Sequence, residues 1–302
     1  MADVLGADAA PLPAGWWPVD RLILGYLAAA GLLIGIYFRR VPGAGWLLGL
    51  HAAGAALIVL AVLARPRPGS ASYKLQAAFR HWYPLPYVAS CYKVMAILIP
   101  SVRGVQWDVE MARADLALWG ANPTVWLERV QAPWLTELLQ VAYSLFVPAV
   151  LLVAVLLWRQ RRREAFRYYA FLIALGFLAS YVGYLLVPVR GPRFLLAGIQ
   201  RLELRGLWLF PWLQQALDRL ESAHYDCFPS GHTELTLLAW WGSRQISTNL
   251  FRGFSVYSVL ILFATVYLRY HYTVDVFAGA ALAAVLLVMA PYLYRLKRLP
   301  GG

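Results

Sequence analysis

Residues 274–294 read VDVFAGAALAAVLLVMAPYLY. A helix that crosses a membrane needs about 20 mostly apolar residues, and this stretch supplies them with a single charged side chain, Asp275, near its start. The whole chain has the same character, since 61% of its 302 residues are hydrophobic and only 14% are charged. Soluble proteins are about 25% charged, so too few charged side chains remain to cover a soluble core. The composition predicts an all-α integral membrane protein.

Further apolar stretches predict more helices of this kind. Five are clear from hydrophobicity alone: 22–38, 46–64, 138–158, 168–188 and 254–268. Two are weaker, because 82–100 carries Lys93 and 233–247 carries Glu234 and Arg244. No alternation typical of barrel strands is present, and a lipid-exposed backbone must then be helical. Together with 274–294, the pattern predicts about eight transmembrane helices.

The positions of Lys and Arg predict how these helices are oriented, because basic residues favour cytoplasmic loops. Three groups stand between or after predicted helices: Arg65, Arg67, Lys74 and Arg80; Arg159, Arg161, Arg162, Arg163 and Arg167; Arg295, Lys297 and Arg298. Eight helices with both termini in the cytoplasm place all three groups inside. The net charge of +12 therefore reflects topology. No basic stripe interleaved with aromatic residues is present, so no nucleic-acid partner is expected.

The spans divide the chain into two parts. Residues 1–81 would form two N-terminal transmembrane helices and a cytoplasmic loop, and residues 82–302 a six-helix core. Two segments of the core, 101–137 and 189–229, are expected to lie outside the membrane on the extracytoplasmic side. The first of them is typical of an amphipathic interfacial helix, which we interpret as a lid or packing element.

Polar residues beside membrane spans are costly and suggest function. They form three clusters: PVRGPR at 188–193, CFPSGHT at 227–233 and RYHYTVD at 269–275. In the predicted topology, each cluster lies where a helix begins or ends at the extracytoplasmic face. Three segments that are distant in the sequence are therefore expected to converge on one site.

The residue types in these clusters suit phosphate. Ser230 can cap the helix that follows it, and Gly231 lets an anion approach the N–H groups at the helix start. Arginine binds phosphate oxygens in a bidentate fashion, and three arginines are expected at this face: Arg190, Arg193 and Arg269. We interpret all five residues as phosphate-binding.

Two histidines and one carboxylate complete the predicted chemistry. His271 and Asp275 are four residues apart, so Asp275 can accept a hydrogen bond from one ring nitrogen and leave the other free to attack phosphorus. His232 can supply a proton to the leaving oxygen. A metal held by His232, His271 and Asp275 is the competing interpretation. Neighbouring arginines would crowd a cation, so a site without metal is favoured.

These motifs resemble those of the type-2 phosphatidic acid phosphatase superfamily. Pro229-Ser230-Gly231-His232 resembles its central motif, and His271-x-x-x-Asp275 followed by Ala278-Gly279 resembles its last motif. The resemblance covers roughly residues 82–294 and implies that the six-helix core is catalytic. It also implies a phosphohistidine on His271, with Asp275 as its partner, His232 as general acid, and neither metal nor other cofactor.

Departures from the family pattern favour one branch. Leu186 stands where the family's first motif has Lys, and Thr265 where the last motif has Arg. With two extra N-terminal helices and Gly191-Pro192-Arg193, the chain resembles the inositol phosphorylceramide synthases, and the two histidine motifs also resemble the sphingomyelin synthases. This resemblance implies a lipid phosphotransferase that moves a phosphate-containing head group from a phospholipid to an alcohol or polyol.

Two alternatives remain open. The nearer one is a lipid-phosphate phosphatase acting on polyprenyl or diacylglycerol phosphates, because such enzymes share both histidine motifs. The distant one is a transporter or non-catalytic scaffold, suggested by Lys93, Glu137 and Glu234 in or beside spans. Three neighbouring residues are also candidates for the lining of an acceptor pocket: Glu137, Gln140 and Tyr143.

Overall fold

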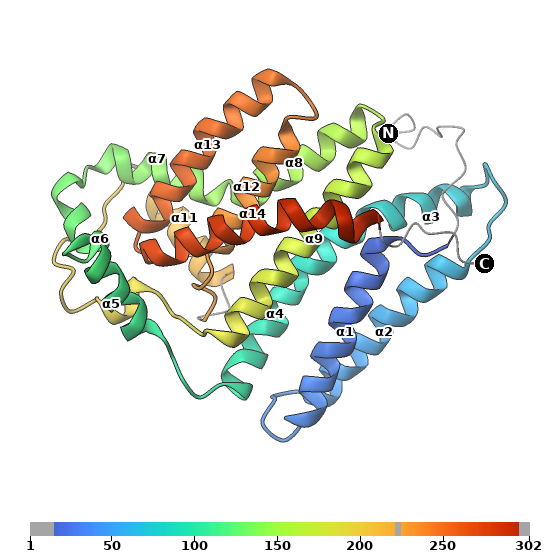
Figure 1. Ribbon diagram of the computed structural model, residues 1–302, viewed down its shortest axis with the longest axis horizontal. Helices are drawn as coiled ribbons and strands as arrows, with labels where there is room; N and C mark the ends of the chain where they lie inside the picture. Colours follow the sequence, from blue (N-terminus) through green and yellow to red (C-terminus); the bar gives the residue numbers. More distant parts are fainter. Residues whose placement is uncertain (1–14, 221–224, 296–302) are drawn as a thin grey trace.

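The computed structural model describes residues 15–220 and 225–295, which form helices joined by short connections (Figure 1). Within these residues the only sheet-like pairing is one bridge between Val189 and Asp226. The elements in chain order are α1 (Pro18–Ile36), α2 (Ala44–Leu63), α3 (Ala71–Trp82), α4 (Pro84–Val102), α5 (Asp108–Trp119), α6 (Pro123–Trp126), η2 (Leu127–Val130), α7 (Pro133–Ser144), α8 (Phe146–Arg159), α9 (Arg163–Leu186), α10 (Pro192–Leu195), α11 (Phe210–Leu220), α12 (Gly231–Ser243), α13 (Thr248–Tyr267) and α14 (Thr273–Arg295). The predicted all-α class is confirmed.

The helices fit a multi-pass membrane protein. In the part of the chain that the structure describes, six helices are long and apolar enough to cross a membrane, namely α1, α2, α4, α9, α13 and α14, and the bent pair α7–α8 adds a seventh if it is one span. The remaining predicted span corresponds to α12, whose 13 residues extend only about 20 Å. That is shorter than the roughly 30 Å hydrocarbon layer, so the count of eight stays a prediction.

The predicted helix 138–158 is two helices instead of one. α7 ends at Ser144 and α8 begins at Phe146, with an angle of 47° between them. Pro148 lies in the first turn of α8. Proline has no N–H to donate to the carbonyl four residues earlier. The carbonyl of Ser144 therefore lacks its helical hydrogen bond, and the helix is interrupted there. The bend brings the end of α7 and the start of α8 against the candidate site described below.

The short helix α12 lies at the centre of the bundle and packs against α8, α9, α13 and α14. Its contact with α14 depends on Gly279, because a Cβ atom there would clash with the main-chain carbonyl of Ser230. The Ser230 N–H donates to the carbonyl of Asp275 at 3.0 Å. This close approach holds the beginnings of α12 and α14 side by side.

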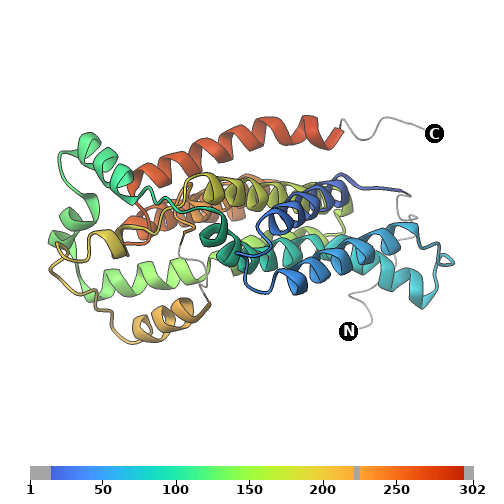
Figure 2. The same cartoon turned by 90° about the horizontal axis from the view of Figure 1, so that it is seen from below.

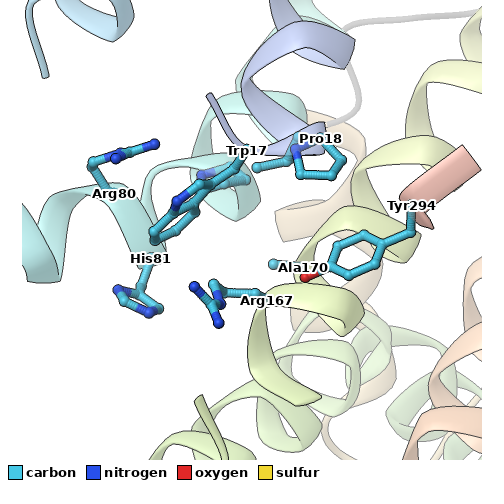
Figure 3. A pocket seen from close by; sticks show the side chains of 9 residues that line it. Trp17, Pro18, Arg80, His81, Arg167, Ala170 and Tyr294 are labelled. Carbon is cyan, nitrogen blue, oxygen red and sulfur yellow. The ribbon is translucent and has the colours of Figure 1, made fainter. Parts of the chain in front are cut away.

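The segment expected as a loop between α2 and α4 contains α3, and Arg80 on this helix is buried instead of lying in a solvated loop. Its guanidinium pairs with buried Asp20 of α1 at 2.9 Å, which offsets the cost of burying the charge. Figure 3 shows Arg80 and Arg167 around Trp17, with their guanidinium carbons 4.2 and 5.2 Å from the indole ring. These contacts join α1 to α3 and α9.

The ends of the molecule differ in structure. Figures 1 and 2 show α5, α6 and α11 gathered toward one end and α1, α2 and α3 toward the other. In the residues that the structure describes, short helices occupy the segments 101–137 and 189–229, and their place outside the membrane stays a prediction. They surround the end of α9 and the beginnings of α12 and α14, where the three polar clusters lie.

Candidate active site

Main-chain hydrogen bonds join the three polar clusters. The N–H of Cys227 donates to the carbonyl of Val189 at 3.1 Å, and the N–H of Arg193 donates to the carbonyl of Arg269 at 3.2 Å. With the Ser230–Asp275 bond described above, each cluster is bonded to the other two. The three loops thus form one framework at the end of α9.

The two histidines of the clusters face each other within this framework. Nε2 of His271 lies 3.5 Å from Nδ1 of His232. The His232 ring stacks on Tyr143, with 4.4 Å between ring centroids, and contacts Phe146 at 4.5 Å. Because Tyr143 and Phe146 stand on either side of the α7–α8 break, the bend in this pair forms one wall of the site.

The orientation of His271 differs from the expected one. Nδ1 of His271 lies 2.9 Å from the main-chain carbonyl of Cys227 but 3.6 Å from Oδ2 of Asp275, which is too long for a hydrogen bond. A carbonyl oxygen only accepts, so Nδ1 carries the hydrogen and Nε2 carries the lone pair. The tautomer needed for attack is set by a main-chain group.

Cys227 contributes directly to the site, although no pattern in the sequence indicates a role for it. Its thiol donates to Oδ2 of Asp275 at 2.8 Å, and Sγ lies 3.3 Å from Nδ1 of His271. The N–H of Tyr272 also donates to Oδ2 of Asp275 at 2.8 Å. Burial raises the pKa of the Cys227 thiol well above its ordinary value, so the sulfur keeps its proton. The thiol therefore fills the place beside Asp275 that the sequence had assigned to His271.

The residues predicted to bind phosphate differ in their hydrogen-bond partners. Ser230 caps α12, because its Oγ accepts from the N–H of Thr233 at 3.3 Å, and Gly231 is the first residue of that helix. The Arg190 guanidinium lies against the ring of Phe194, and its buried Nε has no hydrogen-bond partner among the described residues.

The other two arginines pair with carboxylates. Arg193 pairs with Asp218 at 3.2 Å and lies 4.9 Å from the ring of Tyr270, which itself stacks on Tyr143. The Arg269 guanidinium pairs with Glu128 at 2.9 Å and donates to a main-chain carbonyl. The pair of Arg269 with Glu128 holds the 269–275 loop against η2.

Two aspartates of α5 hold the site loops and were not singled out from the sequence. Asp108 accepts hydrogen bonds from the N–H groups of Arg190 at 3.0 Å and Gly191 at 2.8 Å. Asp115 accepts from the N–H groups of Thr273 at 2.9 Å and Val274 at 3.0 Å, which begin α14. The two aspartates are seven residues apart, so they lie on one face of α5. That spacing, with both carboxylates on one face of an amphipathic helix, is the signal that could have identified them.

The polar residues that suggested a transporter have local partners or face outward. Both carboxylate oxygens of Glu137 accept main-chain N–H groups at the beginning of α11, for example that of Leu207 at 2.8 Å. Glu234 is buried and accepts a hydrogen bond from Ser180. Lys93 is exposed on α4. Of the three residues proposed for an acceptor pocket, Tyr143 is the one that contacts a catalytic histidine, through its stack on His232.

The chain was also compared with known proteins. Residues 110–289, more than half of the chain, match the family model described as the PAP2 superfamily. The matched range contains both histidines, Asp275, Cys227 and the three arginines. No curated protein and no solved structure matches the chain.

Proposed function

Because the chain belongs to the PAP2 superfamily, we propose that it is a lipid phosphotransferase that works through a phosphohistidine on His271 at the extracytoplasmic face. Membership in the family means phosphoester hydrolysis or transfer of the type-2 phosphatidic acid phosphatase kind. The observation that carries the proposal is the pair of imidazoles, with Nε2 of His271 3.5 Å from Nδ1 of His232.

In the proposed first step, Nε2 of His271 attacks phosphorus and the bond from phosphorus to the lipid oxygen breaks. The bonding electrons leave with that oxygen, which takes a proton from the imidazolium form of His232. His232 is neutral in the structure, and the negative charge of a bound phosphate favours the protonated form. Since in-line transfer places phosphorus between the nucleophile and the leaving oxygen, we expect the His232 ring to move away from Nε2 when substrate binds. In the second step, His232 takes a proton from an alcohol, whose oxygen attacks phosphorus. The bond from phosphorus to Nε2 breaks and its electrons return to His271 as the lone pair.

Charge on the phosphoryl oxygens needs hydrogen-bond donors in fixed positions. The unpartnered Nε of Arg190 and the N–H groups at the beginning of α12 are two candidate sources, in clusters that main-chain hydrogen bonds join. Arg193, beside Tyr270, is a third. For Arg269, the ion pair with Glu128 favours a role in holding the loop over a role in binding phosphate.

The surroundings of the site favour a lipid substrate. An apolar cavity of about 680 Å³ lies between α5, α6, α13 and α14, and its lining includes Trp119, Trp126 and Phe277. Thr273 and Val276, which flank Asp275, also line it. A hydrocarbon chain in this cavity would leave its phosphate close to the beginning of α14.

Transfer and hydrolysis are separated by dependence on an acceptor. Purified protein in detergent is given a phospholipid labelled in its phosphate, with and without an added alcohol or polyol. We expect labelled product only with the acceptor present. Release of inorganic phosphate at the same rate without acceptor would favour a lipid-phosphate phosphatase instead. Unchanged activity in a folded His271→Asn variant would contradict both mechanisms, whereas no turnover of any lipid phosphoester by the parent would favour a non-catalytic protein.

A further inference from the structure

Three potential metal ligands converge behind the nucleophile. They are Sγ of Cys227, Nδ1 of His271 and Oδ2 of Asp275, which lie within 4.8 Å of one another. The separations are 2.8 Å from sulfur to Oδ2, 3.3 Å from sulfur to Nδ1 and 3.6 Å from Nδ1 to Oδ2. All three side chains are buried. This set includes the thiol and leaves out His232, so it differs from the metal site considered from the sequence.

The distances between these three ligand atoms fit a small cation with tetrahedral coordination. Zinc binds sulfur at about 2.3 Å and histidine nitrogen or carboxylate oxygen at about 2.0–2.2 Å, which places neighbouring ligand atoms roughly 3.3–3.6 Å apart. Only the sulfur–Oδ2 pair must open by more than a few tenths of an ångström. A second observation points the same way: Oδ1 of Asp275 is buried and has no hydrogen-bond partner among the described residues. The carboxylate therefore has capacity to bind a cation.

We propose that Cys227, His271 and Asp275 form an inhibitory site for a thiophilic divalent cation such as Zn²⁺ or Cd²⁺. The thiolate selects such ions over Mg²⁺ and Ca²⁺, which prefer oxygen ligands. Because the ligands are buried, the cation enters slowly, and inhibition develops over time after mixing.

The chemistry of binding explains why the site inhibits. The thiol of Cys227 loses its proton to solvent when sulfur bonds the cation. Nδ1 of His271 must give up its hydrogen to become a ligand, and that hydrogen moves to Nε2, so the imidazole stays neutral. One proton is released per ion. Nε2 then holds a hydrogen in place of its lone pair and cannot attack phosphorus.

Binding is tested directly, without reference to activity. The purified full chain in detergent is titrated with Co²⁺ as a spectroscopic probe and with Zn²⁺ in competition. We expect one ion per chain, with the absorption typical of a thiolate–cobalt bond, and about tenfold or greater loss of affinity in Cys227→Ser. Cys91→Ser is the matched control, because Cys91 is the other buried free cysteine, and it should bind as the parent does. Equal affinity in Cys227→Ser, or no thiolate–cobalt absorption in the parent, would overturn the inference.

Inhibition is measured separately, and this half rests on the proposed role of His271. Zn²⁺ should slow phospholipid turnover progressively, a chelator should restore it, and Mg²⁺ should have no effect. Relative to its own uninhibited rate, Cys227→Ser should need about tenfold more Zn²⁺ or more. Binding without inhibition would contradict the role of His271 while leaving the metal site intact. If turnover depends on His271 but the chain binds no ion, the metal site is contradicted and the role of His271 stands.

Discussion

His271 is oriented by a carbonyl and a thiol instead of by the carboxylate four residues away. Its Nδ1 atom lies 2.9 Å from the carbonyl of Cys227, and Oδ2 of Asp275 is occupied by the Cys227 thiol and the Tyr272 N–H. Asp275 therefore stabilises the loop around the imidazole and lies close enough, at 3.6 Å, to attract its positive charge during transfer.

The pH dependence of stability should report on His232. Burial, with a smaller contribution from the charge of His271, lowers the pKa of His232 to about 3, whereas the unfolded value is about 6.5. The unfolded chain therefore binds this proton more readily, so the stability from neutral His232 is complete above about pH 6.5. It is lost as the pH falls toward 3, by about 1.4 kcal/mol per pH unit.

The measurement is the free energy of unfolding of the parent and His232→Gln, followed by tryptophan fluorescence between pH 7 and about 4.5. The parent should lose more stability than the variant over this range, by up to about 2–3 kcal/mol. Parallel curves for the two proteins would mean that His232 is not buried as a neutral group.

Several features of the site could be predicted from the sequence because they are local. Ser230 caps the helix that follows it, and two histidine motifs of fixed spacing mark the beginnings of α12 and α14. Cys227, Asp108 and Asp115 could not be predicted in the same way. Their partners lie in other loops, and only the packing of α5 and α12 against α14 brings them together.

At the scale of elements, hydrophobic length predicted the long helices well and their interruptions poorly. The break between α7 and α8 depends on Pro148, and α3 is held by an ion pair between Arg80 and Asp20 that no local pattern indicates. The sequence alone predicts that α5 is a lid or packing element. Its two aspartates give it a more specific role, because Asp108 binds the 190–191 loop and Asp115 binds the beginning of α14.

Asp115→Ala should therefore reduce turnover without direct contact with substrate. The change removes hydrogen bonds to the beginning of α14, each of the charged type worth about 1.5–3 kcal/mol, and lets the His271–Asp275 segment move. We expect kcat to fall by about tenfold or more, with Asp115→Asn intermediate because its amide oxygen still accepts. Steady-state kinetics on both variants provides the check.

Glu110→Ala is the matched control, because Glu110 lies on the same helix and is exposed. It should leave kcat unchanged. If Asp115→Ala kept the parent kcat, α5 would be a passive covering of the site.

At the scale of the whole molecule, the position of the site relative to the membrane follows from α9. This helix has 24 residues, about 36 Å at 1.5 Å per residue, with the arginine-rich segment at its beginning and the 188–193 cluster at its end. If it crosses the membrane, these two segments lie on opposite sides. The excess of arginine before α9 favours the cytoplasm for its beginning.

Labelling of introduced cysteines tests this orientation. Gly198→Cys and Gln160→Cys place a thiol at an exposed position after and before α9, and both native cysteines are buried. A membrane-impermeant maleimide should label Gly198→Cys in intact cells and Gln160→Cys only after lysis. The unmodified chain serves as the background. The opposite labelling pattern would place the active site in the cytoplasm.

The central claim is that His271 carries the transferred group. The most direct measurement is to mix the enzyme with a phospholipid labelled in its phosphate, quench in alkali, which preserves phosphohistidine, and locate the label by mass spectrometry of peptides. We predict label on His271, formed before product and absent from His271→Asn. Turnover with label on another residue, or with His271→Asn still active, would contradict the account.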